Sequence, residues 1–157
     1  MTKKLVAIRI KGNIGLRKPM KDTLTQLRLY KVNYCVVLPN TPNMIGMLHK
    51  VKDFITWGEI DGDTFESLLK TRGKLPANKP LTGEYVQEKS KMSLEDFSKA
   101  FTDGAKNWKD VPGLKPFFRL KPPTGGFERK GVKQPFSLGG SLGYRREKVN
   151  DLVRKML

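Results

Sequence analysis

Residues 5–60 read LVAIRIKGNIGLRKPMKDTLTQLRLYKVNYCVVLPNTPNMIGMLHKVKDFITWGEI, and this stretch decides the fold. It opens with a strand pattern in which Val6, Ile8 and Ile10 share one face and Arg9 takes the other. Side chains alternate between the two faces of a strand, so the pattern predicts a strand that is buried on one face only.

A helix signal and a second strand signal follow. Pro19 suits the first position of a helix, and Met20, Leu24 and Leu27 then recur along one helical face. Residues 33–38 are β-branched and aromatic, and they predict a buried strand.

The pattern then repeats. Thr41 is a good N-cap, and Pro42 fits the first turn of a second helix. Residues 54–60 supply a third strand. The order β-α-β-α-β predicts an α+β fold in which helices cover one face of a small sheet, while the strand directions stay open. We assign residues 1–61 to this core and residues 62–157 to a helical, loop-rich C-terminal extension.

The extension contains three further helix signals, which we expect to start at Asp63, Ser93 and about Arg146. The first two have an acidic residue three positions after the cap, as in a capping box. Residues 74–92 hold prolines and a glycine, and they are expected to form at most one strand, around residues 84–87.

Positive charge is concentrated in two blocks of the chain. The 157 residues include 31 Lys and Arg against 15 Asp and Glu, a formal net charge of +16. Residues 1–72 carry 13 basic and 6 acidic side chains, and residues 105–146 carry 10 and 2. The spacer at residues 73–104 is balanced, with 5 of each. Such an excess attracts a polyanion: nucleic acid, an anionic membrane face or an acidic protein.

Several classes of protein do not fit the sequence. The longest apolar run is residues 34–38, whereas a membrane-spanning helix needs about 20 apolar residues. Cys35 is the single cysteine and His49 the single histidine; neither lies in a setting that activates it, and metal sites need several such residues. We therefore predict a cytoplasmic protein that is not an enzyme, with no metal, cofactor, membrane partner or small-molecule substrate.

The second basic block, residues 105–146, mixes cations with glycines, prolines and aromatic rings, and this composition suits RNA. Lys and Arg neutralise phosphates, aromatic rings stack on unpaired bases, and Gly lets backbone amides approach closely. The alternative is a solvated basic loop whose aromatic residues dock on the core. We expect the phenylalanines to belong mainly to the core and the charges to face a polyanion.

The first basic block centres on residues 11–21. A basic loop that leads into a helix N-terminus places cations beside unpaired backbone amides, which is a suitable phosphate site. Gly12 and Gly15 do not form a dinucleotide-binding fingerprint, because the third glycine and the later acidic residue are missing. The alternative is an ordinary loop between a strand and a helix, with lysines on its surface.

Residues 5–60 also contain spaced groups that are typical of one family. These groups are Val6-Ala7-Ile8-Arg9-Ile10, Gly15, Lys21-Asp22-Thr23-Leu24, Leu27-Arg28-Leu29, Asn40-Thr41-Pro42, Gly46-Met47 and Val51. In their order and spacing the chain resembles the universal large-subunit ribosomal protein numbered thirty in bacteria and archaea and seven in eukaryotes. The remaining residues resemble the longer, archaeal-type form of that family.

The resemblance implies a core with some likeness to the ferredoxin fold and a structural, ribosome-bound role in holding folded large-subunit rRNA. The implied partners are that rRNA, with 5S rRNA nearby, and neighbouring large-subunit ribosomal proteins. The resemblance also implies contacts from the loop around Arg17 and Lys18 and from the helix start at Thr41. Taken with the charge pattern, it gives these expected RNA-binding residues: Lys11, Arg17, Lys18, Lys21, Arg28, Thr41, Lys115, Arg119, Lys121, Arg129, Lys130, Lys133, Arg145 and Arg146.

Two other functions remain compatible with the charge distribution. One is a regulatory nucleic-acid-binding protein that acts off the ribosome, and the other is a basic adaptor for an acidic protein. Co-sedimentation with the large subunit at high salt separates them from a ribosomal protein, because only a protein held by several contacts stays bound.

Overall fold

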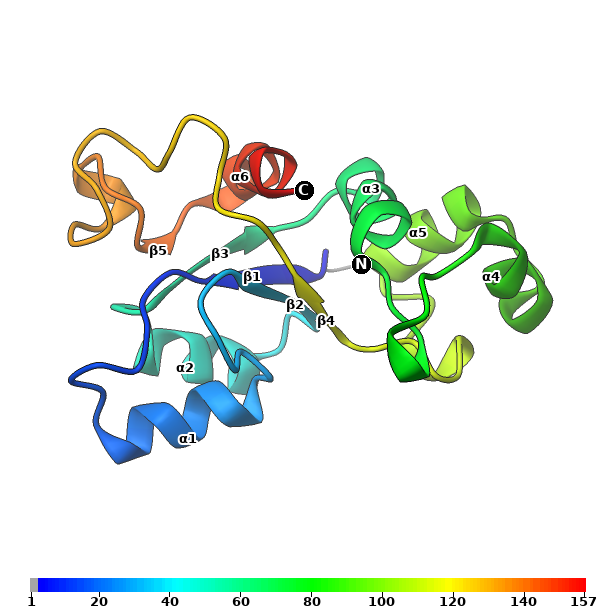
Figure 1. Ribbon diagram of the computed structural model, residues 1–157, viewed down its shortest axis with the longest axis horizontal. Coiled ribbons are helices and arrows are strands. Elements are labelled where there is room, and N and C mark those ends of the chain that lie inside the picture. Colours follow the sequence, from blue (N-terminus) through cyan, green and yellow to red (C-terminus); the bar gives the residue numbers. More distant parts are fainter. Residues whose placement is uncertain (1–2) are drawn as a thin grey trace.

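The computed structural model describes residues 3–157, and its centre is a five-stranded mixed sheet of order β4-β2-β1-β3-β5 (Figure 1). β1 pairs antiparallel with both β2 and β3; β4 pairs antiparallel with β2, and β5 pairs parallel with β3. The predicted α+β class is confirmed. The strands are β1 (Leu5–Arg9), β2 (Tyr34–Leu38), β3 (Ile55–Glu59), β4 (Phe117–Arg119) and β5 (Gly143–Tyr144).

The strand directions give the sheet two distinct ends. Because both neighbours of β1 are antiparallel to it, Arg9 at its last position lies beside the first residues of β2 and β3. We call this the Arg9 end of the sheet and the opposite one the Leu5 end. β4 also reaches the Arg9 end, where Arg119 lies opposite Tyr34.

Helices α1 (Lys18–Gln26) and α2 (Pro42–Lys50) cover one face of the sheet, as the sequence predicts. Their apolar sides meet the sheet in one core, where Ala7, Leu24 and Leu48 are fully buried. This half of the fold therefore follows from the periodicity of its own segments.

The extension covers the other face. It supplies the helices α3 (Gly62–Arg72), α4 (Gly83–Ser90), α5 (Leu94–Thr102) and α6 (Val149–Met156). A second core forms between this layer and the sheet, around Ile8, Phe65, Phe97 and Phe118. β1 is consequently buried on both faces, and the expectation of a strand buried on one face was wrong. The second cover comes from residues far along the chain, which the local alternation does not report.

Two local expectations also need correction. The N-cap of α3 is Asp61, whose carboxylate accepts the Thr64 N–H at 2.7 Å, and Asp63 lies within the first turn. Residues 84–87 are helical, within α4, and not a strand. A helix of two turns places only Val86 fully in the core, which is too few apolar positions to show a helical period. The helix start at Ser93 is confirmed.

Candidate nucleic-acid interface

The fold brings part of each basic block, the loop before α1 and the loop before β5, to the same end of the sheet. In Figure 1 the loop before α1 and the loop before β5 lie at the same end of the long axis, on opposite sides of the sheet, whereas α4 and α5 lie at the other end. The balanced spacer, residues 73–104, forms those distant helices. Basic segments more than 100 residues apart in the chain therefore reach the Arg9 end of the sheet.

The buried side chain of Arg9 holds the loops of the first basic block in place. Its side chain is only 2% exposed, although the sequence pattern places it on a polar face. The guanidinium donates to the carbonyls of Lys11 (2.9 Å), Leu29 (2.9 Å) and Tyr30 (3.1 Å) and to the side-chain oxygen of Asn13. Burial lowers the pKa of Arg9, and no ion pair within residues 3–157 involves it. Arg9 thus ties the β1–α1 loop to the α1–β2 loop.

Three cations of the first block, Arg17, Lys18 and Lys21, are exposed to solvent. Arg17 holds the N-cap position of α1 without a side-chain cap, and Lys18 and Lys21 lie on the first turns. Thr41 does not join them, because α2 begins after the last residue of β2, at the Leu5 end. Its hydroxyl already accepts the Met44 N–H at 3.3 Å. The two expected phosphate-facing helix starts therefore lie at opposite ends of the fold.

A buried ion pair fixes the second block. Arg145 is 2% exposed and donates to both carboxylate oxygens of Glu128, to the Thr56 hydroxyl (2.8 Å) and to the Ser141 carbonyl (2.6 Å). Burial raises the pKa of Glu128, but hydrogen bonds from Arg145 and Ser141 outweigh that effect and lower it overall. Arg145 was expected to contact RNA, and its burial corrects this: the guanidinium is paired inside the protein and holds the loop.

Three cations remain exposed on the loop that this pair fixes, namely Arg129, Lys130 and Lys133. The backbone N–H of Lys130 donates to the Gly139 carbonyl at 3.3 Å, so the loop folds back on itself. Gly139 has a φ of +90°, which a residue with a side chain rarely adopts. The loop is therefore shaped by its glycines and presents its charges outward.

A cluster of three aromatic rings, from Tyr30, Tyr34 and Phe117, lies beside Arg119 at the edge of the sheet. Tyr34 and Phe117 stack with ring centroids 5.6 Å apart, and Tyr30 meets Phe117 edge to face at 5.6 Å. The Arg119 guanidinium lies 5.8 Å from the Tyr34 centroid. Phe118, on the opposite face, is fully buried, as expected of a core phenylalanine.

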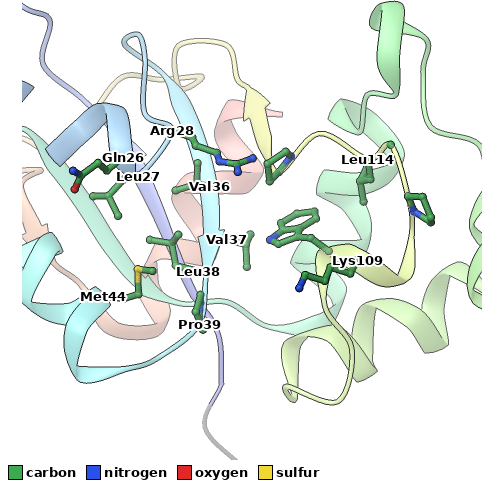
Figure 2. A pocket seen from close by; sticks show the side chains of 14 residues that line it. Gln26, Leu27, Arg28, Val36, Val37, Leu38, Pro39, Met44, Lys109 and Leu114 are labelled. Atoms are coloured by element: carbon green, nitrogen blue, oxygen red, sulfur yellow. The ribbon is translucent and has the colours of Figure 1, made fainter. Parts of the chain in front are cut away.

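Arg28 lines a groove of about 670 Å³, where β2 runs past the end of β4 (Figure 2). The groove walls include Val37 and Leu38 of β2 and Leu114 and Lys109 of the facing segment. Its lining holds no acidic residue, histidine or cysteine, and its two charged side chains are Arg28 and Lys109. Arg28 thus lines this groove, opposite the segment that carries Lys109.

The other expected residues fall in different surroundings. Lys115 donates to the side chain of Asn78 at 2.9 Å, on the side of the α3–α5 helices. Arg146 is exposed and lines a cleft whose other charged residues are Lys3, Glu59, Arg145, Glu147 and Lys148. Lys121 is exposed just after β4.

The structure adds two cations that the sequence argument missed. Lys31 and Lys52 are exposed in the short connections that lead into β2 and β3, and both strands start at the Arg9 end. The signal that could identify them is strand direction, which the sequence left open. Among residues 3–157 there is no cluster of three or more potential metal ligands and no helix long and apolar enough to cross a membrane.

Comparison with known proteins is consistent with this geometry. The family model described as ribosomal protein L30p/L7e matches residues 5–55. Three relatives share the description "large ribosomal subunit protein uL30". The relative from Methanopyrus kandleri is 46% identical over 94% of this chain and 100% of its own length. That from Methanococcus maripaludis is 47% identical over 96% and 97%, and that from Nanoarchaeum equitans is 46% identical over 95% and 96%.

Proposed function

Because this chain belongs to the ribosomal protein L30p/L7e family, in its long archaeal form, we propose a structural function for it in the large ribosomal subunit. That function is to bind and stabilise folded rRNA through the Arg9 end of the sheet. The family is not enzymatic. The observation that carries the proposal is that basic loops from both blocks reach the same end of the sheet. Either block by itself would be explained equally well as a charged surface in contact with water.

The residues proposed to contact phosphates are the exposed cations of the Arg9 end, together with the half-buried Lys11. They come from the β1–α1 loop, the short loops before β2 and β3, the end of β4 and the loop before β5. Charge-assisted bonds to phosphate fix an RNA-binding protein in register, and loops held by buried groups lose little conformational entropy on binding. The set is Lys11, Arg17, Lys18, Lys21, Lys31, Lys52, Arg119, Lys121, Arg129, Lys130 and Lys133.

Salt dependence of binding to large-subunit rRNA tests the proposal. Each neutralised phosphate steepens the fall of affinity with salt, and 6–10 contacts cost about 10³–10⁵ in affinity between 50 and 200 mM salt. Replacing Arg17, Lys18 and Lys21 together by alanine should weaken binding and flatten that slope. The same is expected when Arg129, Lys130 and Lys133 are replaced.

The matched control removes the same charge from the other end of the molecule. Lys79, Lys89 and Lys91 are exposed in and around α4, and replacing them by alanine should leave the slope close to that of the unmodified protein. If the control flattened the slope as much as the two test variants do, binding would follow net charge alone. The Arg9 end would then have no special part in it.

A further inference from the structure

Exposed apolar side chains occur on the two basic loops of the Arg9 end. Within residues 3–157 the large apolar side chains that are well exposed include Ile14, Tyr30 and Val32. Ile14 is fully exposed, and the other two are more than 40% exposed. All three lie on the two loops that Arg9 ties together, and we call them the apolar tip.

Ile14 is held outward by a tight turn. The Leu16 N–H donates to the Asn13 carbonyl at 3.1 Å and closes four residues into a turn. Gly15, at the third position, has a φ of +73°, as a type II turn requires. The side chain of Ile14 therefore occupies the corner of a defined turn.

The base of the turn is equally well defined. Asn13 accepts from the buried Arg9 guanidinium. The two successive N–H groups of Ile10 and Lys11 both donate to the Phe54 carbonyl, at 2.9 and 3.1 Å, which is a β-bulge that turns the chain out of the sheet. Ile14 therefore makes no contact with the core, and the fixed turn leaves its side chain open to a partner.

We propose that the apolar tip contacts unpaired bases of the RNA, while the cations around it contact phosphates; this inference rests on the proposed function. No acidic residue occurs in residues 9–18 or 28–33, whereas Lys11, Arg17 and Lys31 lie in these loops. Against an apolar protein surface those charges would lose water without compensation. Single-stranded RNA loops offer both kinds of partner, since they present splayed bases next to phosphates.

Substitutions at one position separate this contact from phosphate binding. Ile14→Ser should weaken binding to large-subunit rRNA about 10- to 100-fold, the range expected when a buried isoleucine is lost. The slope of affinity against salt should not change, because no phosphate contact is removed. Ile14→Leu, which keeps an apolar side chain, should bind like the unmodified protein. Dimethyl sulfate footprinting should show unpaired bases that the unmodified protein and Ile14→Leu protect and Ile14→Ser does not.

Two results would overturn the inference. If Ile14→Ser bound rRNA as tightly as the unmodified protein and left the same footprint, the tip would face a neighbouring protein or solvent, even with the salt slopes as proposed. If Ile14→Ser lost affinity together with a flatter slope, the loop would contact phosphates and not bases. Failure of the unmodified protein to bind rRNA would overturn the proposed function as well, and it is seen before any Ile14 variant is compared.

Discussion

The ion pair between Arg145 and Glu128 should stabilise the protein far more than a surface pair does. The Arg145 side chain is 1% exposed and that of Glu128 is 27% exposed, so Glu128→Ala leaves a guanidinium buried without its counter-ion. Removing one partner of a buried pair costs about 3–5 kcal/mol. We expect the lower part of that range, about 3 kcal/mol, because Arg145 keeps its bonds to Thr56 and Ser141. For a chain of this size that loss lowers the melting temperature by roughly 6–12 °C.

Glu147→Ala is the matched control. It also removes one carboxylate, but Glu147 pairs with Lys3 at 3.6 Å across a surface where the two side chains are 76% and 55% exposed. Surface pairs of this kind contribute about 0–1 kcal/mol. Equilibrium unfolding in urea, with both variants measured against the unmodified protein, gives the two free-energy differences directly.

A double variant tests the cause. Glu128→Ala combined with Arg145→Met removes the stranded charge, so the double variant should be more stable than Glu128→Ala alone. The reasoning is refuted if Glu128→Ala costs no more than Glu147→Ala. It is also refuted if the double variant is no more stable than Glu128→Ala.

Three further predictions concern other parts of the fold. Burial lowers the pKa of Lys4 to about 8, although the negative charge of Asp110 acts to raise it. Between about pH 8 and 10.5 the folded state therefore binds fewer protons than the unfolded state, and the free energy of unfolding should rise with pH. Denaturant unfolding should show that Lys4→Met removes this part of the rise. Gly58→Ala would place a Cβ 1.9 Å from the Arg146 carbonyl oxygen, and we expect a loss of about 1–3 kcal/mol in the same unfolding assay. Thr41→Ala removes the cap of α2 and should cost about 1 kcal/mol, with little effect on the salt slope of RNA binding.

Most of the secondary structure was predictable because its signals are local. The cap at Thr41 and the apolar spacing of α1 each lie within a few residues of the element that they specify. The helix α4 was not predicted because its local signal is too weak: Val86 is its one fully buried residue, and a single position defines no period.

For the expected binding residues, too, local features were predictable from sequence and the placement of distant segments was not. The sequence by itself determined that the chain has two basic blocks and a balanced spacer, because charge is a property of composition. Only the tertiary structure decided which cations reach the same end of the sheet: the antiparallel pairing of β1 with β2 and β3 adds Lys31 and Lys52 and leaves Thr41 at the other end. It also decided that Arg9 and Arg145 hold loops from within. Strand pairing and burial depend on contacts between distant segments, and a charged side chain looks the same in sequence whether water or a carboxylate solvates it.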